Sequence, residues 1–518
     1  MRCGVIIIWI VVELKFHLAE ECPKAFLDPL HPNAFVCECS KEHCANPFDA
    51  AKLSVDFSRE GAVLYRTSDG GDRLARYQLE IHALGDNSTT GTVNRLVIDR
   101  SWKFQKIIGF GGAMTDAAAL NIERLKDESL RQRLLEAYFA GDGLGYNILR
   151  INMASCDFST REYSYAEKDG DFDLASFKLA EEDDWKLRHA KKSIAISTAA
   201  GRPLKVFASP WSAPAWMKTN GHMRGGGSLK DGERFWKTWA NYFVKFIESY
   251  TAAGVPIWAV TTQNEPSTGA FPHHSFQAMY LPPEQAQHFV RDLLHPALSS
   301  SKVARDTNII IHDDFRRNLP DWPDKILNDP AVDSVVAGIG VHWYFDTAAQ
   351  YFITSVPPEN LDRTHEGHPN QFILNTEACI TESHRVRYGN FTRAMLYAKD
   401  IVEDLNHWVN GWVDWNIALD PQGGPNWVSN FADSTVIVDE EKQTFYKQPM
   451  FYALGQFSRF LERDAIRIAA APEAKINGMG TVAFQNPNGT IAVVLLNYNA
   501  ASAVSITLVD GDSSIPVN

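Results

Sequence analysis

The chain has 518 residues, a formal net charge of −13 at pH 7 and 45% hydrophobic residues. This length exceeds one ordinary domain and suits a barrel of ~250 to 300 residues with an accessory domain or two. Because a protein that binds phosphate backbones needs a basic surface, the acidic balance argues against nucleic acid as a partner.

The N-terminus has the pattern of a secretory signal peptide. Arg2 supplies an early positive charge, residues 3–12 form an apolar run too short to span a bilayer, and Ala19 offers a cleavage site. No later segment is long and apolar enough to anchor the chain in a membrane. We therefore expect a signal peptide over residues 1–19 and a mature chain without a transmembrane segment, on the secretory or endolysosomal route. Sequons compatible with glycosylation on this route lie at Asn87, Asn390 and Asn488.

Six cysteines remain after this leader. Four of them crowd the N-terminal region: Cys22, Cys37, Cys39 and Cys44. An oxidising compartment would join these four into two disulfide bridges. A zinc site is the alternative, but the spacing of Cys37 and Cys39 is tighter than the usual two-residue metal knuckle. Cys156 and Cys379 lie far apart in apolar contexts, and we expect them to be buried free thiols.

Short alternating apolar runs near both ends of the chain predict antiparallel β structure. These runs lie at residues 62–65, 77–81 and 96–98, and again at residues 481–484, 491–496 and 504–508. We expect the two ends to pair into one β-sandwich.

Between the two ends, buried strand candidates alternate with amphipathic stretches such as residues 233–250 and 284–294. This alternation is typical of parallel strands joined by crossover helices. The candidate strands lie at residues 107–111, 147–151, 205–209, 257–262, 308–312, 338–342, 371–375 and 411–415. Eight strands are the number that closes a (β/α)8 barrel.

A (β/α)8 barrel carries its chemistry at the C-terminal ends of its strands, and polar or aromatic residues gather at those points in this chain. They are Arg150, Trp211, Glu265, His342, Tyr344, Glu377, Trp415 and Asn416. This placement predicts a functional site at the barrel mouth.

Two of these residues are carboxylic acids, Glu265 after the fourth strand and Glu377 after the seventh. Retaining glycosidases need such a pair ~5 to 5.5 Å apart, with one group ionised as nucleophile and the other protonated as acid. We expect Arg150 and the Tyr344 hydroxyl to hold Glu377 ionised, and the charge of Glu377 to raise the pKa of Glu265. A structural salt bridge inside the mouth is the alternative.

Three other polar motifs are better explained by structure. Residues 109–112 lack the Lys-Ser/Thr of a phosphate loop and fit the tight first barrel strand. His273-His274 and residues 365–368 lack helical metal spacing and are expected to be loop histidines. Asp313-Asp314 follows the fifth strand, where it either shapes the mouth or forms a solvated face.

Longer motifs around these positions are specific enough to indicate a family. They lie at residues 109–116, 153–159, 208–211, 262–266, 341–344, 411–416 and 423–428. They closely resemble glycoside hydrolase family thirty, in particular its acid β-glucosidases (glucosylceramidases). The resemblance covers almost the whole chain after the leader, including the N-terminal cysteines.

By this resemblance Glu265 would be the acid/base and Glu377 the nucleophile. The glucose subsite would be lined by Asp157, Trp211, Asn264, Trp415 and Asn430. The residues supporting the nucleophile would be Arg150, His342 and Tyr344.

We therefore expect a (β/α)8 TIM barrel with two accessory units. The barrel would comprise residues 105–415 plus 449–464. The antiparallel β-sandwich would comprise residues 49–104 plus 465–518. A small disulfide-bearing β subdomain would comprise residues 20–48 plus 416–448.

The resemblance implies a lysosomal retaining β-glucosidase that cleaves glucosylceramide to glucose and ceramide through a covalent glucosyl intermediate. It implies no metal or organic cofactor, but a saposin-type activator and an anionic lipid surface as partners, with a peripheral place on the lumenal membrane. Exposed aromatics such as Phe271 or Tyr351-Phe352 could touch the bilayer. The same machinery could instead act on a β-xyloside or a β-1,6-glucan, and a catalytically silent secreted binding protein is the alternative from another class.

The chain departs from the family pattern at two places. It ends at Asn518, soon after its last expected strand, where relatives continue, so we expect an open edge on the sandwich. The loops around Phe271, His274 and Phe315 also differ, and such loops help to set the aglycone.

Overall fold

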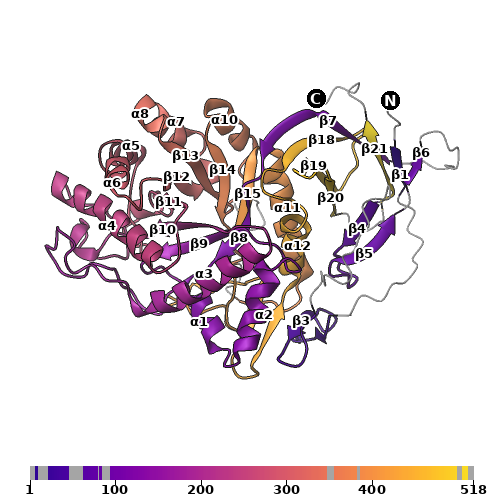
Figure 1. The fold of residues 1–518 in the computed structure, drawn as a ribbon, viewed down its shortest axis with the longest axis horizontal. Coiled ribbons are helices and arrows are strands. Elements are labelled where there is room, and N and C mark those ends of the chain that lie inside the picture. Colours follow the sequence, from indigo (N-terminus) through magenta and orange to yellow (C-terminus); the bar gives the residue numbers. More distant parts are fainter. Residues whose placement is uncertain are drawn as a thin grey trace.

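The computed structural model describes residues 6–9, 22–45, 62–79, 81–83, 94–346, 355–381, 385–498 and 504–511. Figure 1 shows a barrel on one side of the molecule and, on the other, a β sheet that contains strands from both ends of the chain. Within these described ranges, no helix has the length and apolar character needed to cross a membrane.

Eight parallel strands close into a barrel in the order β10-β11-β12-β13-β14-β15-β8-β9. Their bounds are β8 Gly109–Ala113, β9 Ile148–Met153, β10 Lys205–Pro210, β11 Ala259–Thr261, β12 Asn308–Phe315, β13 Val336–His342, β14 Phe372–Glu377 and β15 Val409–Asn416. Each lies on one of the eight expected segments, so the predicted barrel is confirmed. The expectation worked because strands buried on both faces read as continuous apolar runs.

Helices surround the barrel. The longer ones are α1 Asp116–Arg124, α2 Glu128–Phe139, α3 Glu181–Ala199, α4 Glu233–Ala252, α10 Glu359–Gly367, α11 Phe391–Asn406 and α12 Pro449–Ser458. Shorter ones are α5 Pro283–Phe289, α6 His295–Ser300, α7 Asp321–Leu327 and α8 Pro330–Asp333. The helix expected at residues 284–294 is α5 followed by a π-helical turn, Val290–Leu294.

Local sequence explains where these helices form. Thr115 caps α1, because its side chain accepts from the backbone N–H of Ala118 and so satisfies a donor that the helix leaves unpaired. In α4, Trp239, Phe243 and Phe246 recur at helical spacing and are all buried.

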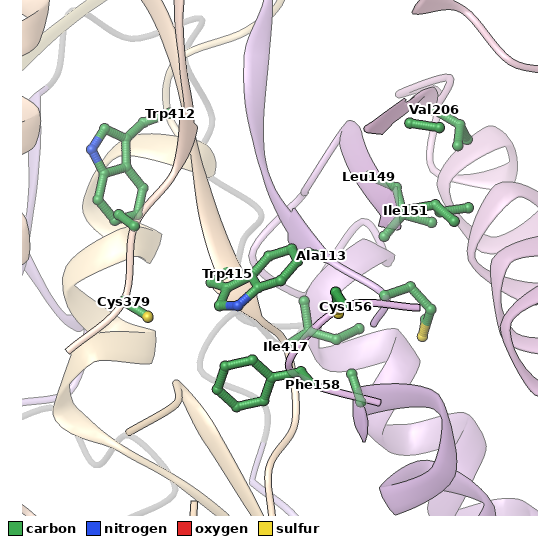
Figure 2. Packing of buried hydrophobic residues seen from close by; sticks show 14 of the residues in the cluster. Ala113, Leu149, Ile151, Cys156, Phe158, Val206, Cys379, Trp412, Trp415 and Ile417 are labelled. Carbon is green, nitrogen blue, oxygen red and sulfur yellow. The ribbon is translucent and has the colours of Figure 1, made fainter. Parts of the chain in front are cut away.

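The barrel interior is filled by one apolar layer drawn from six strands: Ile148, Phe207, Ala259, Ile310, Leu374 and Val413. A larger cluster lies outside and above it, and Figure 2 shows Trp415 in this cluster among Ala113, Cys156, Phe158 and Ile417. Glycine permits close strand pairing at one point, because a Cβ on Gly411 would lie 2.1 Å from the carbonyl oxygen of Gly109.

The second unit is a seven-stranded sheet with the order β20-β19-β18-β7-β21-β1-β6. Its strands are β7 Asn94–Lys106, β18 Ile466–Pro472, β19 Met479–Gln485, β20 Ile491–Asn497, β21 Ile506–Gly511, β1 Ile6–Trp9 and β6 Ile81–Ala83. A separate hairpin pairs β4 Ala62–Arg66 with β5 Ala75–Leu79. The expectation that both ends of the chain form one β domain is confirmed.

The expected open edge does not fall at the last strand. β21 lies between β7, which it pairs in parallel, and β1, which it pairs antiparallel. The edge strands are β20 and β6. The other residues of the expected signal peptide lie outside the described ranges, so its removal stays a prediction. Between the barrel and this sheet, α11 contacts both β15 and β19.

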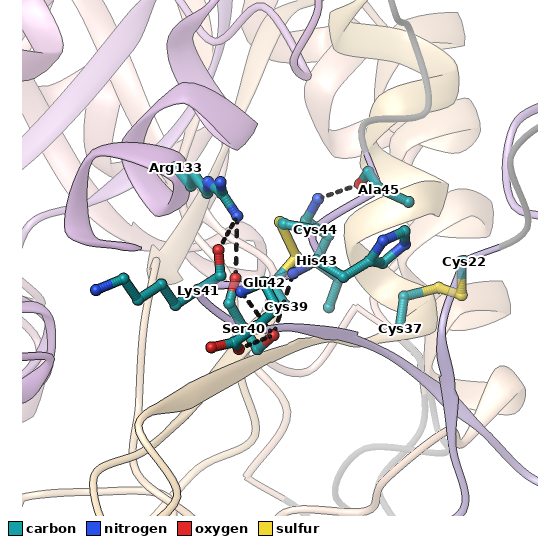
Figure 3. The surroundings of a disulfide bond; sticks show 11 residues. Cys22, Cys37, Cys39, Ser40, Lys41, Glu42, His43, Cys44, Ala45 and Arg133 are labelled. Carbon is teal, nitrogen blue, oxygen red and sulfur yellow. Dashed lines mark hydrogen bonds between the residues drawn. A yellow bond between two sulfur atoms is a disulfide. The ribbon is translucent and has the colours of Figure 1, made fainter. Parts of the chain in front are cut away.

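The third unit is a four-stranded sheet of β16 Val436–Asp439, β17 Thr444–Lys447, β3 Val36–Cys39 and β2 Lys24–Ala25. Disulfides join Cys22 to Cys37 and Cys39 to Cys44 (Figure 3), which confirms the two predicted bridges and leaves no thiolate there for zinc. Cys156 and Cys379 are buried free cysteines, as expected. The residue limits of the three units stay predictions.

The two described sequons differ in exposure. Asn488 is exposed in the turn between β19 and β20, whereas Asn390 is partly buried and caps α11. Asn87 lies outside the described residues. Glycosylation at all three stays a prediction.

Candidate active site

The carboxyl ends of the barrel strands bring the two predicted acids together. Glu377 is the last residue of β14, and Glu265 lies four residues after β11 ends at Thr261. A carboxylate oxygen of Glu265, a carboxylate oxygen of Glu377 and a ring nitrogen of His342 all lie within 4.8 Å of one another. Both carboxyl groups are largely buried. This spacing is that of a carboxyl pair acting on one bond.

The backbone aims Glu265 through an unusual conformation. Its φ is +42°, a region that residues other than glycine rarely adopt. Its N–H donates to the carbonyl of Asp313 at 2.9 Å, and its own carbonyl accepts from the N–H of Thr268 at 2.9 Å. These two bonds hold the strained turn in place, and such strain is typical of functional sites.

Glu377 is held by two donors, one from β9 on the far side of β15 and β8 and one from the segment that follows β13. Nη1 of Arg150 donates to its Oε2 at 2.5 Å, and the Tyr344 hydroxyl donates to its Oε1 at 2.9 Å. Arg150 is fully buried, and its Nη2 also donates to Oδ1 of Asn264 at 2.9 Å. The donors that the sequence assigned to Glu377 therefore both contact it.

Burial, rather than the charge of Glu377, is the main cause that raises the pKa of Glu265. Burial raises this pKa to about 7 against the opposing effect of the His342 bond, and the charge of Glu377 adds a smaller increase. The sequence correctly predicted that the pKa of Glu265 is raised, but it named the charge of Glu377, which is the smaller cause. Burial of a side chain is not visible in the sequence.

His342 contacts Glu265, and a ring nitrogen of His342 also lies within 4.8 Å of a carboxylate oxygen of Glu377, the residue that it is expected to support. Its Nδ1 lies 3.2 Å from Oε1 of Glu265. Burial by itself would lower the pKa of His342, but the charge of Glu377 and the bonds to Asp313 and Glu265 outweigh burial and raise it to about 10. A pKa this high favours the imidazolium, in which both ring nitrogens carry a proton and can donate.

Two tryptophans form an aromatic wall beside the pair. Trp211 and Trp415 stack with ring centroids 5.1 Å apart and an interplanar angle of 21°. The guanidinium carbon of Arg150 lies 5.2 Å from the centroid of each ring. Phe158 packs edge-on against Trp415, as Figure 2 shows. Both tryptophan rings are buried, so the sugar-stacking role expected for them stays a prediction.

Asp157 supplies a further carboxyl group at this mouth. Its Oδ2 accepts from Nδ2 of Asn430 at 2.9 Å and from Nδ2 of Asn426 at 3.3 Å. Burial raises the pKa of Asp157 to about 7 against the effect of the Asn430 bond. Asn426 was not among the predicted site residues, although its place in the motif at residues 423–428 was a usable signal.

Sequence reasoning also left Asp313 and Asp314 undecided. Both side chains are fully buried, so the alternative of a solvated face is wrong. Ser209 and Thr376, which lie at the ends of β10 and β14, were missed, although strand-end position was again a signal.

The atoms of Glu265, His342 and Glu377 are close enough together to suggest a metal site, but their charges disfavour one. Arg150 already donates to Glu377, and the imidazolium of His342 has no free lone pair for a cation. A second close group, Asp346, Asp400 and Asp404, surrounds Arg316, whose charge occupies its centre.

A (β/α)8 barrel that presents a close pair of carboxyl groups beside two tryptophans has the arrangement of a glycoside hydrolase. Residues 107–461 match the glycosyl hydrolase family 30 TIM-barrel domain, and residues 464–518 match the glycosyl hydrolase family 30 β-sandwich domain. The chain belongs to glycosyl hydrolase family 30.

Individual relatives agree with this assignment. The lysosomal acid glucosylceramidase of Mus musculus is 42% identical over 95% of this chain and 92% of its own length. Among solved structures, an endo-β1,6-glucanase superposes with a TM-score of 0.74 at 27% identity, over 87% of this chain and 95% of its own. SrfJ from Salmonella typhimurium superposes with a TM-score of 0.76 over 88% and 97% of the two chains; at 23% identity this likeness concerns the fold alone.

Proposed function

We propose that this protein is a retaining β-glucosidase that hydrolyses glucosylceramide to glucose and ceramide. The observation that carries the proposal is the pair Glu265 and Glu377: one carboxylate oxygen of each lies within 4.8 Å of the other in the mouth of a family 30 barrel. An inverting enzyme needs its two carboxyl groups ~6.5 to 9.5 Å apart to admit a water between them. The 42% identity to a lysosomal glucosylceramidase supports the choice of substrate.

In the first step, Glu377 attacks the anomeric carbon while Glu265 gives its proton to the glycosidic oxygen. The C1–O bond breaks, ceramide leaves as the neutral alcohol, and the sugar is held as an ester of Glu377. Burial keeps Glu265 protonated at acidic pH. The donors Arg150 and Tyr344 hold the Glu377 carboxylate oxygens in place for attack.

In the second step, Glu265 acts as the base. It takes a proton from water as the water attacks C1 from the face that ceramide has left, and Glu377 departs as carboxylate. Two inversions give β-glucose, so the configuration is retained, and Glu265 ends protonated and ready for another cycle.

The remaining predicted residues would hold the glucose ring. Trp211 and Trp415 would wall one face, and Asp157, steadied by Asn430, would accept from sugar hydroxyls. Oδ1 of Asn264 accepts from Arg150, and this bond fixes the orientation of the amide. The amide N–H₂ would then donate to the sugar 2-hydroxyl. That contact would strengthen as the oxocarbenium ion develops.

We place the enzyme in the lysosome, at the lumenal membrane surface, with anionic lipid and a saposin-type activator as partners. The name of the mouse relative supports the compartment. Phe271 is 57% exposed in the loop after β11, and a side chain of this size in water suits contact with lipid. Tyr351-Phe352 lie outside the described residues. Unchanged binding of a Phe271→Ser variant to phosphatidylserine vesicles would refute the assignment of Phe271 as a lipid contact.

One other substrate is supported by a specific observation. The 27% identical structure of an endo-β1,6-glucanase shares this fold over most of both chains. A β-1,6-glucan would use the same two carboxyl groups and would differ only in what the mouth accepts beyond the first sugar.

The test compares the native chain with Glu377→Gln at about pH 5 on fluorogenic β-glucoside and β-xyloside, on glucosylceramide in micelles, and on β-1,6-glucan. Loss of the nucleophile should remove most of an acceleration of at least ~10⁶-fold. Glu182→Gln is the matched control, because Glu182 is equally buried but pairs with Arg161 on the helical layer. NMR of the first product should show the β-anomer. Turnover of β-1,6-glucan but not of glucosylceramide would show that the glucan is the substrate. A folded chain that turns over none of these compounds would be a catalytically silent binding protein.

A further inference from the structure

Asp313 is a fully buried carboxylate at the end of β12. Its φ is +52°, and that of the preceding His312 is +71°, at the point where the pairing of β12 with β13 shifts register. Positive φ values at two successive residues other than glycine are strained, so the surrounding contacts must stabilise them. The backbone therefore departs from a regular strand at the residue whose side chain makes the contacts described next.

Both oxygens of Asp313 accept two bonds each. Oδ1 accepts from Nε2 of His342 at 3.1 Å and from Oγ1 of Thr376 at 2.6 Å. Oδ2 accepts from Nη2 of Arg150 at 3.0 Å and from Oγ of Ser209 at 3.0 Å. Its four lone-pair sites are thus filled by side chains from four different strands.

The two cations on Asp313 are the ones that contact the carboxyl pair. His342 reaches Oε1 of Glu265 through its other ring nitrogen, and Arg150 reaches Oε2 of Glu377 through its other terminal nitrogen. Asp313 is therefore linked to Glu265 through His342 and to Glu377 through Arg150. Its side chain contacts neither of these two carboxyl groups.

We propose that Asp313 is a positioning residue that sets the protonation and orientation of His342 and anchors Arg150. With His342 cationic, Nδ1–H donates to Oε1 of Glu265, so the acidic proton of Glu265 stays on Oε2, where a glycosidic oxygen can take it. This role rests on the proposed function, because it concerns the direction in which Glu265 gives its proton.

Together with the charge of Glu377, the bond and the charge of Asp313 favour one of two arrangements of this proton. Burial favours the neutral imidazole, and the charge and bond of Asp313 are among the causes that raise the pKa of His342 against burial. A neutral imidazole whose Nε2–H still faces residue 313 would present a lone pair at Nδ1. The O–H of Glu265 would then donate inward to His342, away from the substrate.

Charged and aromatic side chains from several elements face His342. On the acceptor side they are Asp313 and Glu265, with Glu377 close by in the same cluster. His312, on β12, also interacts with it: burial lowers the pKa of His312, and the charge of His342 lowers it further. Phe315 and Tyr344 pack edge-on against the ring.

The first test follows His342 directly and needs no turnover. In protein labelled with ¹⁵N-histidine, the ring signals of His342, assigned by their loss in His342→Gln, should remain those of an imidazolium well above the ordinary pKa of ~6.5. In Asp313→Asn the titration midpoint should move to lower pH. An ordinary midpoint in the native chain, or an unmoved midpoint in the variant, would overturn the proposal. The first of these outcomes is measurable even if the variant does not fold.

The second test is kinetic and uses Asp183→Asn as the matched control. Asp183 is equally buried, but it pairs with Lys186 at 3.1 Å on α3 and accepts from the Tyr165 hydroxyl instead of from Arg150 and His342. Asp313→Asn should lower kcat/KM by roughly 10- to 100-fold, a size typical of lost orienting partners. The loss should be larger for a methylumbelliferyl glucoside than for a dinitrophenyl glucoside, which needs no proton, and the basic limb of the pH profile should move to lower pH.

The two tests separate the possible failures. An equal loss on both substrates with an unmoved basic limb would show a purely structural role and overturn the inference. A native chain that turns over no β-glucoside would refute the proposed function, and the titration of His342 would still decide whether Asp313 controls its protonation.

Discussion

Nη2 of Arg316 lies 2.9 Å from Oδ2 of Asp346, and both side chains are shut off from solvent. The same nitrogen lies 2.8 Å from Oδ1 of Asp404 and 3.9 Å from Oδ1 of Asp400. One guanidinium thus faces three buried carboxyl groups, which is an excess of negative charge in a region of low dielectric. Burial raises the pKa of each of the three, most strongly at Asp346 and Asp400.

This cluster should make the protein more stable in acid. A carboxyl group whose folded pKa exceeds its unfolded value of ~3.9 contributes stability below that value, and the contribution is lost as pH rises through the folded pKa. Asp400→Asn should therefore raise the free energy of unfolding at pH 7.5 by on the order of 1 to 3 kcal/mol, and change it little at pH 4.5. Urea titrations at the two pH values measure the difference.

A suitable control for that experiment is Asp362→Asn. Asp362 pairs with His407 at 2.8 Å in a partly exposed position, where such pairs contribute under ~1 kcal/mol. A gain in stability that is the same at both pH values would contradict the account of Asp400.

The pH dependence of the reaction should show the burial of Glu265. Since burial raises the pKa of Glu265 to about 7, the acid is protonated below that value and ionised above it. We expect kcat/KM for a poor leaving group to hold below pH 7 and to fall above it. Glu265→Gln should abolish this basic limb while retaining much of the first step on dinitrophenyl glucoside.

Azide provides the complementary measurement for Glu265. Because azide needs no general base, it should restore turnover to Glu265→Gln and yield the β-glucosyl azide. Formation of the α-azide, or a basic limb that persists in this variant, would assign the acid/base role to another group.

Sequence alone led to the barrel and to its two acids, because apolar strands and their end residues follow one another along the chain. The sequence did not reveal that Asp313 contacts both Arg150 and His342. Those contacts depend on a register shift and on a positive φ at His312. Nor did the sequence reveal the cluster around Arg316, whose partners lie at residues 346, 400 and 404 on different elements. Burial, the main cause of the raised pKa of Glu265, is likewise a property of the packed fold.

Strand closure at Gly411 should be sensitive to a single methyl group. A Cβ there would lie 2.1 Å from the carbonyl oxygen of Gly109, in the pairing of β15 with β8, and backbone atoms cannot move away cheaply. Gly411→Ala should lower the free energy of unfolding by roughly 1 to 3 kcal/mol or more, the cost of overpacking. At Gly367, the last residue of α10, the nearest atom to a Cβ is 3.5 Å away. Gly367→Ala should instead stabilise by about 0.4 to 1 kcal/mol. Equal effects at the two sites in thermal unfolding would contradict the packing argument.

The two disulfides should contribute unequally, in the order of the loops that they close. Cys22–Cys37 spans 15 residues, and Cys39–Cys44 spans 5. Restricting the unfolded chain by loops of these lengths is worth ~3 and ~2 kcal/mol. Replacing each pair by serines should therefore destabilise more for Cys22–Cys37, as measured by urea unfolding of oxidised protein.

The smaller loop is also held to the barrel by hydrogen bonds that do not depend on its bridge, which sharpens the expected order. Arg133 of α2 donates to the carbonyls of Ser40 and Lys41 inside the Cys39–Cys44 loop (Figure 3), so that loop stays tethered to the barrel when its bridge is removed. Arg133→Ala should have little effect in the native protein and should add to the loss in the Cys39→Ser, Cys44→Ser variant. If instead the small bridge proves the more stabilising of the two, the entropy of the unfolded chain is not what these bridges control.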